Sequence, residues 1–265
     1  MLGLGLGLNK GLSIASRTEW TPLNLNTVLW LDASDESTIT ESEGAVSKWD
    51  DKSGNNYHAI QTEGTRQPTT GVKTINTLNA IDFLDDTMTI SETVFGATIE
   101  NAFVIAVYKI DSISRGVLFS LSGFSQAANR WQTHAPWEDG DIYFDVSGQT
   151  GNNRLQEPLG ANAGDNIMVS WYASNTEGKK EIFKNGGLTP LAGNTTTGSV
   201  NFSGTVWLAS HNDIFQDTSI GEFIIINGTV SSDERQKLEG YLAWKWGLVE
   251  KLPALHPYKA SAPTV

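Results

Sequence analysis

The chain has 265 residues, 39% of them hydrophobic, and its 30 acidic and 18 basic side chains give a formal net charge of −12. This charge disfavours attraction to phosphate backbones and anionic lipid, so we expect no nucleic-acid partner and no membrane partner. Because the chain lacks cysteine, disulfide scaffolds, cysteine-bound metals and thiol nucleophiles are excluded.

The composition is rich in Gly, Thr, Ser and Asn, which is typical of a protein with many strands and turns. No apolar run reaches the length of about 18 residues that a transmembrane helix requires. The first apolar stretch is not preceded by basic residues, so we expect no export by a standard signal.

The first eight residues alternate Leu with Gly or Met, which places Leu2, Leu4, Leu6 and Leu8 on one face of an extended strand. We expect residues 1–26 to form an extended N-terminal arm. The arm either folds back on its own domain or adds to a neighbouring subunit, and the second alternative makes these leucines candidate assembly residues.

From Thr27 onward, short apolar runs are separated by turn residues, as in sandwiches and barrels. Residues 141–146 alternate, which predicts a strand with Ile142, Phe144 and Val146 in the core and a polar opposite face. The pattern repeats at 167–171, whereas residues 103–108 are apolar on both faces and predict a central strand with a covered outer side. The pair at 185–186, Asn-Gly, predicts a tight turn, since both positions require positive φ.

One helix is predicted near the C-terminus. Ser231 and Glu234 form a capping box, apolar residues follow at helical spacing, and Gly247 ends the helix. Trp244 and Trp246 lie about 200° apart around it, so one packs on the sandwich and the other needs a second cover. The tail at 252–258 or another subunit supplies that cover, which adds three candidate assembly residues: Trp244, His256 and Tyr258.

The domains expected are thus the arm at 1–26, a sandwich at 27–230 and a capping helix with tail at 231–265, packed on the sandwich or a neighbour.

Three segments, at 29–35 (LWLDASD), 47–59 (SKWDDKSGNNYHA) and 221–258, carry a family resemblance. Together they resemble a concanavalin A-like, laminin-G-like jelly-roll family of phage virion proteins and marine bacterial surface proteins. The resemblance spans about residues 28–258 and is most specific in the C-terminal helix. It implies an all-β, antiparallel jelly-roll sandwich with one C-terminal helix. It also implies structural roles for the signature residues, with Trp30, Trp49, Trp244 and Trp246 as core or docking aromatics and Asp32, Asp50 and Asp51 in turns and caps.

Members of that family often bind glycans, which needs an exposed aromatic ring beside groups that hydrogen-bond hydroxyls. The segments at 131–139 and 149–154 offer such residues. The candidate glycan-binding residues are Trp131, His134, Trp137, Tyr143, Asn152 and Asn153. The alternative is that these loops are plain connections whose tryptophans fold into the core.

Some members also hold Ca²⁺ at a loop rim, and no other cofactor is expected. Hard oxygen ligands gather at Glu138, Asp139 and Asp141, and again at Asp213 and Asp217. Solvated acidic loops are the alternative interpretation of both groups.

The sequence lacks the alternating carboxylate motif by which glucanases on this fold flank a glycosidic bond. Asp141 and Asp145 are four residues apart, about 13 Å along a strand, whereas a retaining pair needs about 5 to 5.5 Å. The four histidines show no metal-binding spacing. We therefore expect no enzyme, with carboxylates that meet only in three dimensions as the alternative.

These observations lead us to expect a non-enzymatic phage virion structural protein, located on the surface of the capsid or tail as a decoration protein or a tail fibre component. Its expected partners are further copies of itself, other virion proteins and host-surface polysaccharide. The alternatives are a free carbohydrate-binding module and a glycan-cleaving enzyme of a surface protein.

Overall fold

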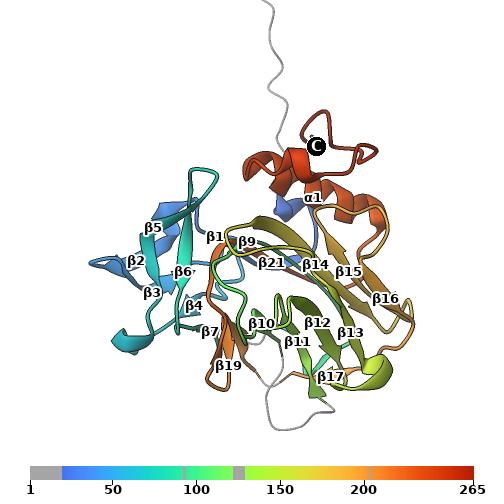
Figure 1. Cartoon of the computed structure of the whole chain (residues 1–265), viewed down its shortest axis with the longest axis horizontal. Helices are drawn as coiled ribbons and strands as arrows, with labels where there is room; N and C mark the ends of the chain where they lie inside the picture. The colour runs from blue at the N-terminus through green and yellow to red at the C-terminus, as the bar shows by residue number, and fades with distance from the viewer. Residues whose placement is uncertain (1–19, 92–93, 122–128, 203) are drawn as a thin grey trace, which may run out of the picture.

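Strand β9 (Asn101–Ile110) lies at the centre of one of two antiparallel layers in the computed structural model, which describes residues 20–91, 94–121, 129–202 and 204–265 (Figure 1). It pairs with β21 (Thr218–Asn227) on one side and with β14 (Asn166–Ser174) on the other. This back layer continues with β1 (Thr27–Asp32), β15 (Lys179–Lys184) and β16 (Ala192–Asn194).

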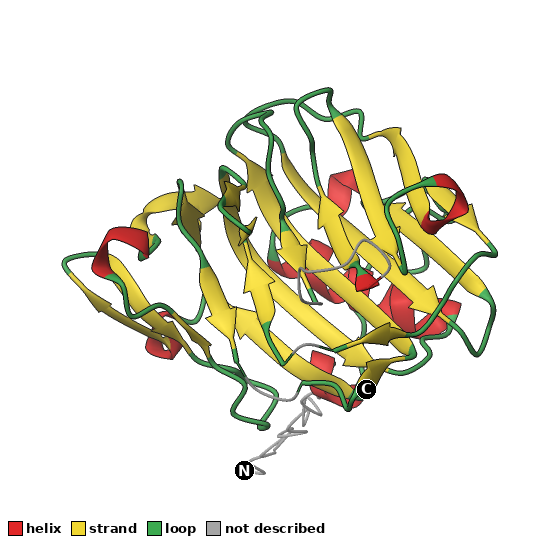
Figure 2. Cartoon of the chain, turned by 90° about the horizontal axis from the view of Figure 1, so that it is seen from below, coloured by secondary structure: helices red, strands yellow, loops and turns green. Residues whose placement is uncertain are grey.

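The second layer, which we call the front layer, packs against the back layer (Figure 2). Its order is β13 (Arg154–Pro158), β12 (Asp141–Val146), β11 (Trp131–His134), β10 (Phe119–Ser120), β18 (Val206–Leu208), β7 (Met88–Ile90), β4 (Ala59–Ile60), β3 (Ala45–Trp49) and β2 (Ile39–Ser42). The layers are joined at one edge by β5 (Thr69–Ile75) and β6 (Leu78–Phe83), because β5 pairs with β3 and β6 pairs with β21. Two small sheets pair β8 (Thr98–Ile99) with β17 (Val200–Asn201) and β19 (Ser210–His211) with β20 (Ile214–Phe215).

The main core lies between the two layers and contains the alternate residues predicted from the sequence. Ile142, Phe144 and Val146 of β12 belong to it, as do the apolar residues at 167, 169 and 171 of β14. Phe119 packs edge-on against the rings of both Trp171 and Phe223, with ring centroids 5.0 and 5.3 Å apart. The predicted all-β, antiparallel sandwich is therefore confirmed.

A second apolar cluster covers the outer face of the back layer. Helix α1 (Ser232–Lys245) packs there, so that residues 103, 105 and 107 of β9 contact the helix side while 104, 106 and 108 face the main core. This double burial explains why the strand is apolar on both faces, since each large side chain removed from water contributes about 1.5 to 3 kcal/mol. Within the described residues, no helix is both long and apolar enough to cross a membrane.

The capping box is present: Glu234 N donates to Ser231 Oγ, and Ser231 N donates to Glu234 Oε2. Trp246 is buried, whereas the side chain of Trp244 is 41% exposed and its Nε1 donates to the carbonyl of Tyr258 at 2.8 Å. The tail of the same chain thus covers Trp244 in part, and the assembly role of this residue stays a prediction. The predicted turn is also present, with φ of 50° at Asn185 and 71° at Gly186.

The assembly predictions have different outcomes. His256 is 3% exposed, with its Nε2 3.5 Å from the carboxylate of Glu239 on α1, so its predicted role as an assembly contact is wrong. Tyr258 packs closely on α1, where a Cβ added at Gly240 would lie 2.5 Å from the Tyr258 Cβ. Leu2, Leu4, Leu6 and Leu8 lie outside the described residues, and the described part of the arm begins at Trp20, which is buried in the outer cluster.

Two of the three signature segments, 29–35 and 221–258, meet at one buried carboxylate. Glu222 on β21 accepts hydrogen bonds from Nε1 of Trp30 at 2.7 Å and from Nε1 of Trp246 at 2.6 Å. Lys245 lies 2.7 Å from Glu222 and 2.7 Å from Asp32. These residues tie β1, β21 and α1 together, which confirms their interpretation as structural.

Asp51 holds the turn that follows β3. Its Oδ1 accepts from the backbone N–H groups of Trp30 and Ser53, and its Oδ2 accepts from that of Tyr57. An aspartate that binds its own turn in this way replaces missing strand hydrogen bonds. The turn role predicted for this residue is therefore confirmed.

Candidate functional site

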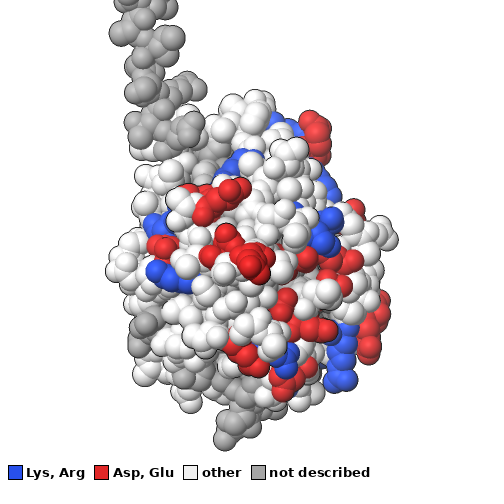
Figure 3. All heavy atoms as spheres, turned by 90° about the vertical axis from the view of Figure 1, so that its left-hand side faces the viewer, with Lys and Arg blue, Asp and Glu red and all other residues white. Residues whose placement is uncertain are grey.

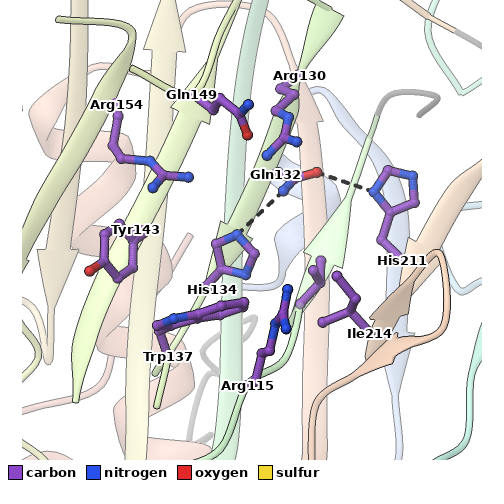
Figure 4. Close-up of a pocket in the computed structure, with 11 residues that line it drawn as sticks. Arg115, Arg130, Gln132, His134, Trp137, Tyr143, Gln149, Arg154, His211 and Ile214 are labelled. Carbon is purple, nitrogen blue, oxygen red and sulfur yellow. Dashed lines mark hydrogen bonds between the residues drawn. The ribbon is translucent and has the colours of Figure 1, made fainter. Parts of the chain in front are cut away.

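The outward side chains of β11, β12 and β13 surround a pocket of about 310 Å³ in the front layer (Figure 4). Strand alternation explains their direction, because Trp131, Phe144 and Leu155 of these strands point into the core. We call this hollow the front pocket. It is lined by Arg115, Val117, Arg130, Gln132, His134, Trp137, Tyr143, Gln149, Arg154, His211 and Ile214.

A chain of hydrogen bonds crosses the floor of the front pocket (Figure 4). His134 Nδ1 lies 2.6 Å from the carbonyl of Gly116, which can only accept, so Nδ1 carries the proton and Nε2 accepts. The Gln132 amide donates to that Nε2 at 3.4 Å, and its Oε1 accepts from His211 Nδ1 at 3.1 Å. These hydrogen bonds link β11 to β19, which lies far along the sequence, and fix the orientation of three polar side chains.

Both histidines of the floor are held neutral. Burial lowers the pKa of His134, and the nearby guanidinium groups of Arg154 and Arg130 add to this effect. Burial likewise lowers the pKa of His211 to about 3, with Arg130 and His134 contributing. Neutral imidazoles offer one donor and one acceptor each, so the floor presents hydrogen-bonding groups rather than additional charge.

Two arginine side chains contact the carboxylate of Asp145, which lies beneath the pocket. Arg154 donates to both oxygens of Asp145 at 2.6 and 2.7 Å, and Arg130 lies 3.4 Å from it. The Arg154 guanidinium also lies 4.7 Å from the centroid of the Tyr143 ring. The polar face predicted for β12 is therefore buried at Tyr143 (8% exposed) and Asp145 (0%).

Trp137 is the aromatic wall of the front pocket. It lies on the turn between β11 and β12, where its N–H donates to the carbonyl of Asp141 and its own carbonyl accepts from Gly140. Its half-buried ring meets the His134 ring edge-on, with centroids 4.5 Å apart. Arg115 lies 5.3 Å from the ring centroid. The turn thus fixes an aromatic surface beside the polar floor.

The structure brings together half of the predicted glycan-binding residues. His134, Trp137 and Tyr143 line the front pocket. The prediction for Trp131 is wrong, because its ring is 1% exposed and packs on Phe144 in the core, with centroids 4.6 Å apart.

Asn152 and Asn153 lie outside the lining of the pocket, and their backbone carbonyls accept hydrogen bonds from Lys180 Nζ at 3.0 and 2.7 Å. Gln132 and Arg154 lie within the two segments predicted to supply the site but were not among the candidate residues, whereas Arg115, Arg130 and His211 lie outside those segments and were missed. The alternation of strands β11 and β13 carried a signal for Gln132 and Arg154.

The predicted calcium ligands do not form a ligand group. Asp139 accepts from the Tyr143 hydroxyl and the Asp141 N–H, and Asp141 accepts from Gln156. Within the described residues, the group of three acidic side chains whose ligand atoms all lie within 4.8 Å of one another is Asp82, Asp111 and Asp217.

Lys73 Nζ lies 3.0 Å from the Asp111 carboxylate in that group, so an ammonium already balances part of its charge. Ca²⁺ takes six to eight oxygen ligands. A lysine ammonium beside those ligands would repel the cation. Neither group therefore fits a calcium ion.

No family model matches the chain, and no curated protein matches its sequence. Solved structures do match. Domain 4 of an extracellular GH43 arabinanase from Geobacillus stearothermophilus, in complex with arabinotriose, has a TM-score of 0.56 at 10% identity, covering 81% of this chain and 98% of that domain.

The binding domain of botulinum neurotoxin DC in complex with SialylT has a TM-score of 0.54 at 14% identity and covers 83% of this chain. The same toxin domain in complex with rat synaptotagmin II gives 0.51, also at 14% identity, covering 82% of this chain. The chain spans 52% of the toxin domains it matches. At these identities the likeness shows the fold, an antiparallel β-sandwich, and nothing more specific.

Proposed function

We propose that this chain is a glycan-binding module whose ligand lies in the front pocket. The observation that carries the proposal is the position of Trp137, an accessible ring fixed beside the neutral floor of Gln132, His134 and His211. Sugars present an apolar ring face edged by hydroxyl groups, so a site that binds them combines an aromatic surface with oriented donors and acceptors.

The lining supports binding rather than hydrolysis. No Asp or Glu lines the pocket within the described part of the chain, whereas glycoside hydrolysis uses a pair of carboxyl groups across the glycosidic bond. Asp145 lies beneath the lining but is 0% exposed and held by Arg154. We therefore propose a module without catalytic activity.

The similar solved structures also support a glycan-binding role. One similar domain was solved with arabinotriose and another with SialylT, so sandwiches of this shape carry saccharide sites in other proteins. We further propose that the sandwich is of the concanavalin A-like jelly-roll kind. The setting on a phage capsid or tail, with further copies, virion proteins and host polysaccharide as partners, stays a prediction from the sequence resemblance.

A panel of immobilised oligosaccharides tests the proposal. It contains neutral arabinans, glucans and galactans, a polygalacturonate with its methyl-esterified form, and a sulfated galactan with its desulfated form. We expect the chain to bind at least one member and Trp137→Ala to lose that binding by about tenfold, which corresponds to about 1.4 kcal/mol from the aromatic stack and the area it buries.

Trp244→Ala is the matched control, because Trp244 is 41% exposed on α1 and lies outside the front pocket. It is expected to leave binding unchanged. Absence of binding to every member, or equal binding by Trp137→Ala and the parent chain, would overturn the proposal.

A further inference from the structure

We infer that the ligand of the front pocket is an acidic glycan, with a carboxylate or sulfate group held by Arg115. The inference rests on the proposed function and specifies its substrate class. It is drawn from the balance of charges in the pocket and from the partners of each arginine.

Three arginines line the pocket, and within the described residues Asp145 is the one carboxylate that forms ion pairs with them. Arg154 forms two short hydrogen bonds with Asp145, whose charge it compensates. Arg130 has a single, longer contact of 3.4 Å with the same group. The excess of positive charge in the lining therefore comes from the arginines, since both floor histidines are neutral and add none.

Arg115 is the arginine best placed to contact a ligand. It is exposed, it lines the pocket, and within the described residues no carboxylate lies within 4.0 Å of its side-chain nitrogens. Its guanidinium lies over the Trp137 ring, 5.3 Å from the centroid. A guanidinium stacked in this way keeps its planar fork of N–H groups, which matches a carboxylate or sulfate with two hydrogen bonds.

This local excess contrasts with the rest of the molecule. The formal net charge of the chain is −12, and acidic side chains gather on the side where β2, β3 and β5 lie (Figure 3). Charges separated by more than about 8 Å are largely screened at physiological ionic strength. The distant acidic side chains therefore repel an anionic ligand only weakly, whereas Arg115 attracts it at close range. A neutral sugar would leave the charge of Arg115 uncompensated, whereas an acidic one would pair with it.

Acidic residues at the rim define the orientation of the ligand. Asp139 and Asp141 lie beside Tyr143, where they accept hydrogen bonds from the Tyr143 hydroxyl and from Gln156. An anionic group placed there would be repelled. The anionic group therefore lies toward Arg115 and Trp137, and a neutral part of the sugar lies over Tyr143.

Calorimetric titration with the charged and neutralised pairs of the panel tests the inference. We expect the polygalacturonate or the sulfated galactan to bind about tenfold or more tightly than its methyl-esterified or desulfated form, because hydrogen bonds between charged groups are stronger than those between neutral groups. The member that binds also distinguishes the two sources of anionic charge, carboxylate and sulfate.

Variants then assign the contact. Arg115→Ala is expected to lower affinity for the acidic oligosaccharide about tenfold, with a smaller loss in Arg115→Lys, which keeps the charge without the fork. Lys251→Ala removes the same charge from an exposed position outside the pocket and should have no effect.

The outcomes separate this inference from the proposed function. Binding of neutral members alone, or equal affinity within each charged and neutralised pair, would overturn the acidic ligand and leave the glycan-binding function standing. Absence of binding to any member would overturn both. Equal loss of affinity in Arg115→Ala and Lys251→Ala would show that net charge, rather than Arg115, governs binding.

Discussion

Arg154 on β13 holds the fully buried carboxylate of Asp145 on neighbouring β12, through Nε to Oδ1 at 2.6 Å and Nη2 to Oδ2 at 2.7 Å. Two parallel hydrogen bonds of this kind fix both partners in orientation as well as in charge. The pair therefore forms a rigid base for Tyr143 and the floor of the front pocket. Arg154 has a structural role, whereas Arg115 is available to contact a ligand.

Replacing Arg154 with methionine should destabilise the fold by roughly 3 to 5 kcal/mol, because the buried carboxylate of Asp145 would keep only the longer contact with Arg130. Urea unfolding measures this change. Lys179→Ala is the control, since Lys179 pairs with Glu177 at the surface, where such pairs contribute at most about 1 kcal/mol. A loss below about 1 kcal/mol in Arg154→Met would contradict the role assigned to the pair.

The neutral state of His211 makes stability depend on pH. Its pKa is about 3 in the fold and 6.5 ordinarily, so below pH 6.5 the unfolded chain takes up a proton that the folded chain does not. The free energy of unfolding should therefore fall as the pH drops from 6.5 toward 3, by about 2 kcal/mol at pH 5 from this residue alone.

His211→Gln removes the titrating group, so the difference in unfolding free energy between pH 7 and pH 5 should shrink by about that amount. Urea unfolding of the parent chain and the variant at both pH values measures it. Any direct effect of the substitution on packing appears equally at both pH values and cancels in the comparison. An identical loss in the two proteins would show that His211 is not held neutral.

Glu222 should be essential for attaching α1 to the back layer. Glu222→Ala leaves the indole N–H groups of Trp30 and Trp246 and the ammonium of Lys245 without their buried acceptor, at a cost of about 3 to 5 kcal/mol. Thermal unfolding and hydrogen exchange of α1 test this expectation. Glu157→Ala, at an exposed glutamate of β13, should change stability by at most about 0.5 kcal/mol. Unaltered protection of α1 in Glu222→Ala would refute the role.

Local patterns predicted much of the fold because they report local physics. The alternation at 141–146 reflects one face of β12 against the core, and the double apolar face at 103–108 reflects burial between α1 and the front layer. The capping box gave the start of α1, where Ser231 and Glu234 satisfy each other's backbone groups. These features depend on neighbours within a few residues, so the sequence alone could indicate them.

The site was harder to predict because its members come from distant segments. His134 and Trp137 belong to one hairpin, but His211 reaches the floor from β19, and Arg115 from the segment before β10. Trp131 was misassigned since its direction depends on the register of β11 with β12, where it pairs with Val146. A shift of one residue would have turned it outward in place of Gln132.

The measurement that tests the central claim most directly is a crystal structure of the chain with the tightest-binding oligosaccharide of the panel. The account predicts a sugar ring within van der Waals contact of Trp137, hydroxyls hydrogen-bonded to Gln132 and His134, and an acidic group within about 3 Å of the Arg115 guanidinium. A saccharide bound elsewhere on the sandwich, with the front pocket empty, would contradict it.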